Sequence, residues 1–74
     1  MSKTIYSKEY KQVVTALKKA RIDASLTQTE VAKKLSKPQS YISKSELGER
    51  RLDVTELKKF ADLYKKSLNY FIKQ

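Results

Sequence analysis

Hydrophobic residues recur with the period of an α-helix in the first third of the chain. Four apolar positions share one face of such a helix: Tyr10, Val13, Val14 and Leu17. Because residues three and four apart lie on the same side of a helix, the pattern predicts a helix from about Ser7 to Ala20. Residues 1–6 show no period and are a candidate for a loose, flexible basic arm.

A second, shorter helix is predicted to begin at a capping box. Thr27 and Glu30 have the S/T-x-x-E spacing, in which the threonine hydroxyl caps the first turn and the glutamate reaches back to the cap. The inner face of this helix is apolar: Val31, Ala32 and Leu35. Ser36 and Lys37 interrupt the apolar pattern, so we expect the helix to end there.

A third helix is predicted from Pro38 to about Leu47, with Ile42 as its clearest apolar anchor. Proline suits the first turn of a helix, because its φ is already helical and its missing N–H would have no partner there. Gly48 is the only glycine in the chain and follows this helix. A left-handed residue at the end of a helix costs glycine least, so the third helix is expected to end at Gly48.

The last third of the chain predicts two more helices. Asp53 and Glu56 repeat the capping spacing before an amphipathic stripe. The stripe consists of four apolar residues: Leu57, Phe60, Ala61 and Tyr64. Ser67 is placed to cap a final short helix that extends to Phe71 and Ile72. The whole pattern predicts an all-α class: a compact five-helix domain over residues 1–74.

The composition excludes most catalytic and metal chemistry. The 74 residues contain no histidine and no cysteine, so the commonest general base, the thiol nucleophile and the usual zinc ligands are absent. One glycine cannot build a glycine-rich phosphate loop. We therefore expect no enzyme activity, no metal site and no cofactor. The charged start of the chain lacks the apolar segment of a secretory signal, and the expected location is the cytoplasm.

The charge favours a polyanionic partner. Seventeen basic residues against eight acidic ones give a formal net charge of +9. Nucleic acid and an acidic membrane both fit this excess. No apolar run approaches the roughly 20 residues that span a bilayer. A basic amphipathic membrane binder is disfavoured, because the apolar faces are used in mutual packing and the lysines are spread over several helices.

The second and third helices have the spacing of a helix-turn-helix over about residues 27–47. When Gln28 is counted as the first position, four apolar residues occupy positions four, five, eight and fifteen: Val31, Ala32, Leu35 and Ile42. The small Ala32 lets two helices cross closely, and the others pin the second helix against the first. The exposed face of the second helix is then polar: Gln39, Ser40, Ser43 and Lys44. A plain helical hairpin is the alternative.

Residues 26–71 resemble the Cro/cI-type helix-turn-helix family of phage and bacterial regulators, which is lambda-repressor-like and XRE-like. The tracts LTQ, PQSYIS, E-x-G-E-R-R and Leu-Lys-Lys-Phe-Ala-x-Leu carry the resemblance in order. The resemblance implies double-stranded DNA as the partner. It implies base contacts by three residues: Gln39, Ser40 and Lys44. It implies DNA backbone contacts by six residues: Gln28, Lys37, Tyr41, Ser43, Arg50 and Arg51. It also implies that Gln28 braces Gln39.

Three residues depart from the family pattern. Ser36 stands where the family usually has glycine in the turn, and a left-handed serine is expected to cost about 1 kcal/mol. Lys37 and Ser45 occupy positions that are commonly apolar in the family. We expect the Ser45 hydroxyl to bond the backbone carbonyl one turn back, which keeps a buried hydroxyl satisfied.

The working hypothesis is a prokaryotic or phage transcriptional regulator, such as a repressor, that binds a palindromic operator as a homodimer. The family commonly dimerises near its C-terminus, which makes Tyr70, Phe71 and Ile72 candidates for the interface; the alternative is that they close the monomer core. A protein-interaction module is the rival class, for example an antitoxin that binds a toxin. In such a module the helix-turn-helix is kept as a scaffold and DNA binding is secondary, although an antitoxin would combine both roles. Independently of that hypothesis, Gln28, Gln39 and Lys44 have the alternative of being ordinary surface residues, and Arg50 and Arg51 that of a solvated charge pair beside Glu49.

Overall fold

The structure of the protein is a computed structural model that describes residues 7–72, and residues 1–6 of the predicted arm lie outside them. The described residues form five helices in this order: α1 (Lys8–Asp23), α2 (Gln28–Leu35), α3 (Gln39–Leu47), α4 (Val54–Tyr64) and α5 (Leu68–Ile72). Residues 7–72 contain no strand. The predicted all-α, five-helix class is therefore confirmed.

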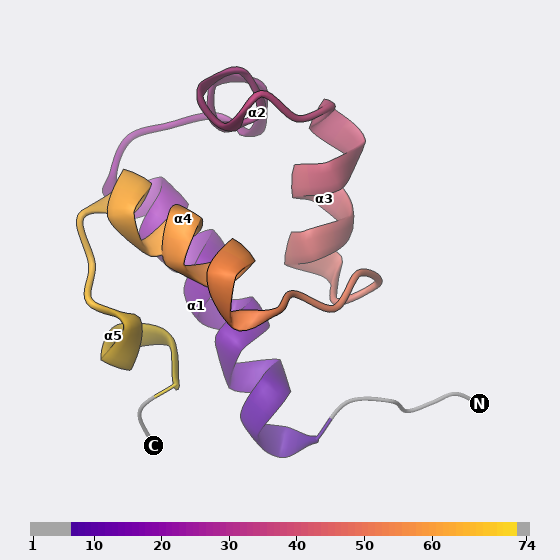
Figure 1. Ribbon diagram of the computed structural model, residues 1–74, viewed down its shortest axis with the longest axis vertical. Coiled ribbons are helices and arrows are strands. Elements are labelled where there is room, and N and C mark those ends of the chain that lie inside the picture. The colour runs from indigo at the N-terminus through magenta and orange to yellow at the C-terminus, as the bar shows by residue number, and fades with distance from the viewer. Residues whose placement is uncertain (1–6, 73–74) are drawn as a thin grey trace.

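Helix α1 is the central helix of the fold (Figure 1). It contacts α3, α4 and α5, while α2 packs on α3. Figure 1 shows α4 crossing α1, with α2 and α3 on one side of the pair and α5 on the other. The predicted helix-turn-helix region contains α2 and α3, which connect to the rest of the fold mainly through the contact of α3 with α1.

Both predicted capping boxes are present. The backbone N–H of Glu30 donates to Thr27 Oγ1 at 3.1 Å, and the N–H of Thr27 donates to Glu30 Oε1 at 2.8 Å. Asp53 and Glu56 exchange the same pair of hydrogen bonds, at 2.8 and 2.9 Å. These bonds satisfy N–H groups that a first helical turn leaves unpaired, so the starts of α2 and α4 are fixed locally.

The turn between α2 and α3 differs from the prediction at one residue. Ser36 is left-handed, with φ 57°, as expected for the position where the family has glycine. Pro38 was predicted inside the first turn of α3, but it is the N-cap: its ψ of 154° is extended, and α3 begins at Gln39. The φ of proline is compatible with both positions, and ψ decides between them. Gly48 ends α3 with φ 79°, as predicted.

Helix α1 is longer than predicted, since it continues past Ala20 to Asp23. The additional turn includes Arg21, whose guanidinium binds Glu46 of α3 and the backbone carbonyl of Leu26. These tertiary contacts hold the turn in place, and the periodicity of α1 alone does not contain them.

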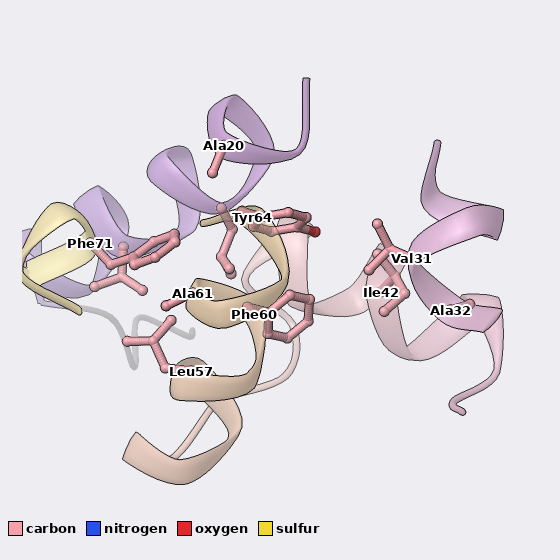
Figure 2. Packing of buried hydrophobic residues seen from close by; sticks show 11 residues of the cluster. Ala20, Val31, Ala32, Ile42, Leu57, Phe60, Ala61, Tyr64 and Phe71 are labelled. Atoms are coloured by element: carbon pink, nitrogen blue, oxygen red, sulfur yellow. The ribbon is translucent and has the colours of Figure 1, made fainter. Parts of the chain in front are cut away.

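One apolar cluster joins all five helices. Its buried members are Val13, Leu17, Ala20, Val31, Ala32, Ile42, Leu57, Phe60, Ala61, Tyr64 and Phe71. In Figure 2, Val31 and Ile42 point from the helix-turn-helix toward Phe60 of α4. Phe71 is 1% exposed and closes the core next to α1 and α4. The structure therefore assigns Phe71 to the monomer core and not to a surface that a second copy could reach.

Ser45 is fully buried on the inner face of α3. Its hydroxyl donates to the carbonyl oxygen of Tyr41 at 2.7 Å, one turn back along the helix. The expected hydrogen bond is confirmed, and it explains how α3 accepts a hydroxyl at a position where a core contact is expected.

Candidate nucleic-acid interface

One face of α3 is directed away from the protein. Gln39, Ser40 and Lys44 are exposed, and Ser43 is half-buried beside them. Leu47 continues the same face at the C-terminal end of α3 and is 66% exposed. Helical geometry places these positions together, because steps of three and four residues return to the same side of a helix. The structure thus brings all three predicted base-contact residues onto one exposed surface.

The predicted bracing of Gln39 by Gln28 is confirmed. Gln39 Nε2 donates to Gln28 Oε1 at 2.8 Å, which joins the first residues of α3 and α2. Gln28 Nε2 in turn donates to Glu46 Oε1 at 3.0 Å. The Nε2 group of Gln39 is therefore held by Gln28, while Gln39 itself is exposed on the outer face of α3.

A buried ion pair lies directly behind these glutamines. Arg21 Nε is 2.7 Å from Glu46 Oε2, and Arg21 Nη2 is 3.1 Å from Glu46 Oε1. The side chains are 13% and 4% exposed. The hydrogen bond to Glu46 raises the pKa of Arg21, against the opposite effect of burial. The pair fixes α1 to α3 and places an acceptor next to Gln28.

Sequence reasoning assigned no role to Arg21 or Glu46, although a signal was present. Each residue follows a fully buried apolar residue, Leu17 or Ile42, by four positions. A charged residue in the apolar stripe of a helix must be paired, because an isolated buried charge is very unfavourable. One such residue of each sign, on two different helices, was the clue to the ion pair.

Tyr41 lies on the other side of α3, against α4. Its ring is parallel to Phe60, with centroids 6.1 Å apart, and its hydroxyl is 3.4 Å from Glu56 Oε2. Two cations lie over the ring: Lys37 Nζ at 5.1 Å and Arg50 Cζ at 4.6 Å from the centroid. Tyr41 therefore positions Lys37 and Arg50 beside α3, and its own contact with DNA stays a prediction.

Arg50 is paired with Glu56 and not with Glu49, the neighbour considered from the sequence. The guanidinium donates to Glu56 Oε2. The pKa of Glu56 is lowered, first by the hydrogen bond from the backbone N–H of Asp53 and also by the bond from Arg50. Arg50 is thus held at the N-terminal end of α4 and does not extend freely into solvent.

The segment between α3 and α4 is fastened to α1 by Tyr10. The Tyr10 hydroxyl accepts a hydrogen bond from the N–H of Leu52 at 2.9 Å and donates to the carbonyl of Arg50 at 3.3 Å. The Arg51 guanidinium lies 5.0 Å from the centre of the same ring. Arg50 and Arg51 therefore follow the C-terminal end of α3, whereas Lys37 precedes its N-terminal end and Gln28 bonds its first residue, Gln39.

Residues 7–72 contain neither a cluster of metal-ligating side chains nor a helix suited to span a membrane. No group of three or more histidine, cysteine, aspartate or glutamate side chains there could hold a metal ion. No helix in that range has both the length and the apolar character needed to cross a bilayer. Within residues 7–72, the exposed face of α3 and its flanking cations form the candidate functional surface.

Comparison with known families identifies the same helices as a helix-turn-helix domain. The model of a helix-turn-helix family matches residues 17–71, which include α2, α3, α4 and most of α5. No curated protein matched the chain.

Proposed function

Because the chain belongs to the Cro/cI-type helix-turn-helix family of DNA-binding regulators, we propose that it binds a palindromic operator as a homodimer and represses transcription there. The observation that carries the proposal is the exposed polar face of α3, with Gln39 held by Gln28 at 2.8 Å. The expected setting is the cytoplasm of a prokaryotic cell, with the chain encoded by the cell or by a phage.

Three side chains on α3 are proposed to read bases in the major groove. The amide of Gln39 can bond both N6 and N7 of adenine. Lys44 lies further along the exposed face and suits the acceptors O6 and N7 of guanine. Ser40 can bond either a base edge or a phosphate. All three are exposed, which supports their access to a groove.

The backbone contacts are proposed at both ends of α3. The contributing residues are Gln28, Lys37, Tyr41, Ser43, Arg50 and Arg51. The net charge of +9 supports this part of the proposal, since phosphate contacts supply a large share of the affinity of a protein for DNA. Contacts with phosphates position α3, and the contacts with bases select the sequence.

The homodimer is proposed to form at the edge where α5 meets the start of α4. Ile72 is 48% exposed and Val54 is 65% exposed. Both line a hollow of about 170 Å³ whose walls include Leu52 and Leu57. Tyr70, also a candidate from the sequence, is half-buried and contributes at most its outer edge. Burying this apolar surface against a second copy would favour association.

The test is a selection of bound sequences from a random duplex pool. The expected result is two inverted half-sites whose centres are about 34 Å apart, one turn of DNA. Gln39→Ala should weaken binding to the selected site by about 1–3 kcal/mol and relax the preference at one base pair. Exposed Gln12→Ala on α1 is the matched control and should leave both unchanged.

A protein-interaction module gives a different result in the same experiment. A module that only binds protein would return no sequence preference and would keep its affinity for the partner protein after Gln39→Ala. An antitoxin that combines both roles would show a sequence preference and would also keep its affinity for the toxin after Gln39→Ala. Equal loss of affinity on every duplex after Gln39→Ala would show that Gln39 contacts the DNA backbone only.

A further inference from the structure

We propose that Glu46 determines which base Gln39 selects, because it fixes the orientation of the two glutamine amides that lie in series with it. The inference rests on the proposed function, since it names a positioning residue for the same DNA-binding surface. We call the series Glu46, Gln28 and Gln39 the amide relay.

The first step of the amide relay is set by charge. Glu46 Oε1 accepts from both Arg21 Nη2, at 3.1 Å, and Gln28 Nε2, at 3.0 Å. An ionised carboxylate has no hydrogen to donate, and a guanidinium has no acceptor. Gln28 can therefore turn only its NH2 group toward Glu46. The 4% exposure of Glu46 leaves its oxygens dependent on these protein donors.

The second step follows from the shape of the amide. Since the NH2 group of Gln28 is directed at Glu46, its carbonyl oxygen faces Gln39 and accepts the bond from Gln39 Nε2 at 2.8 Å. Gln39 is left with its carbonyl oxygen and one N–H for the exposed side. One acceptor and one donor match the N6 and N7 edge of adenine.

The reverse orientation would select a different base. If both amides turned over, Gln39 would accept from Gln28 and present only N–H groups to the groove. Two donors match the two acceptors of guanine, O6 and N7. A carboxylate at position 46 therefore favours adenine over guanine at the base pair that Gln39 contacts, although Glu46 itself touches no DNA.

The test compares two variants that break the amide relay at different steps. Glu46→Gln replaces an obligatory acceptor by an amide that can present either end, and Gln28→Met removes the middle amide while the Arg21–Glu46 pair stays intact. Gln12→Met, at an exposed glutamine of α1, is the matched control. Affinities are measured by fluorescence anisotropy on two duplexes that differ only by adenine or guanine at the pair identified with Gln39→Ala.

The expected result is a change of preference that exceeds any general loss of affinity. The wild-type protein and Gln12→Met should prefer adenine by about tenfold or more, which is the usual discrimination of a bidentate contact. In Glu46→Gln and Gln28→Met the two affinities should differ by less than about threefold. Gln28→Met should also lower the affinity for both duplexes by the same factor, because Gln28 is proposed to contact a phosphate.

An adenine preference that is unchanged in Gln28→Met would overturn the role of the amide relay. A wild-type protein with no sequence preference would overturn the proposed function instead. The amide relay is then judged on the free protein by exchange of the side-chain NH2 protons, recorded by ¹⁵N NMR. Compared with the wild-type protein, Glu46→Gln should accelerate exchange of the side-chain NH2 protons of Gln28 and Gln39 but not of Gln12. Equal exchange rates at Gln28 and Gln39 in the wild-type protein and in Glu46→Gln would overturn the amide relay, whether or not the protein binds DNA.

Discussion

Replacement of the buried Arg21–Glu46 pair tests the energetic basis of the fold and the site together. The two side chains share two hydrogen bonds, at 2.7 and 3.1 Å, and are 13% and 4% exposed. Glu46→Leu leaves a buried guanidinium without its carboxylate, and Arg21→Met leaves the carboxylate without its guanidinium. Loss of one partner of a buried pair costs about 3–5 kcal/mol, because the remaining charge is uncompensated.

The double variant Arg21→Met/Glu46→Leu should be much less unstable than the two single changes suggest. It buries no lone charge, and apolar replacements of similar volume are often close to neutral. It also loses the hydrogen bond to the carbonyl of Leu26 and the one from Gln28. At about 0.5–1 kcal/mol for each of the two lost bonds, the double variant should be destabilised by about 1–2 kcal/mol.

The assay is urea unfolding followed by far-ultraviolet circular dichroism at 25 °C. A domain of this size has a free energy of unfolding of about 4–11 kcal/mol, so each single change removes a large part of it. With a slope near 1 kcal/mol per molar urea, the midpoint should fall by about 3 M or more in each single variant and about 1–2 M in the double variant.

The exposed pair of Lys58 and Asp62 supplies the control. Lys58 Nζ is 3.0 Å from Asp62 Oδ1, but the two side chains are 61% and 65% exposed. Lys58→Met should change the free energy of unfolding by less than about 0.5 kcal/mol. If the effects of Arg21→Met and Glu46→Leu simply add in the double variant, the buried charge is not what makes the single changes costly, and the reasoning fails.

Three further results are expected. Ser36→Gly should raise the free energy of unfolding by about 0.5–1 kcal/mol, because position 36 is left-handed; a lower thermal midpoint would contradict this. Phe71→Ala should destabilise the monomer by about 3–5 kcal/mol, whereas Ile72→Asp should weaken self-association in sedimentation experiments with little change in monomer stability. Backbone hydrogen bonds at the N-terminus of α4 lower the pKa values of Asp53 and Glu56 below their unfolded values. Both carboxylates therefore stabilise the fold fully above the unfolded pKa values, which are near 4. This stabilisation is lost as the pH falls through the lowered pKa values of the folded state. In acid titrations followed by circular dichroism, Glu56→Gln should therefore reduce the pH dependence of stability below about pH 5, and an unchanged dependence would refute the assignment.

The helices and most of their ends were predictable from the sequence because the interactions that form them are local. The capping bonds of Thr27 with Glu30, and of Asp53 with Glu56, join residues three positions apart. The left-handed conformations of Ser36 and Gly48 were also predictable, because Ser36 ends α2 at the turn and Gly48 ends α3. The apolar spacing that packs α2 on α3 left a polar face of α3 exposed, and the residues expected there are on it.

The tertiary structure alone decided which distant residues meet. Arg21 and Glu46 are 25 positions apart, and their hydrogen bonds depend on the angle between α1 and α3, which no local period encodes. Arg50 and Glu56 are only six positions apart, but no helix period predicts that they pair. Tertiary packing also set the extension of α1 to Asp23 and the burial of Phe71 while Ile72 stays exposed. A helix period identifies which side of each element is apolar; only the packed chain determines what that side contacts, because burial and charge pairing are properties of the assembled surfaces.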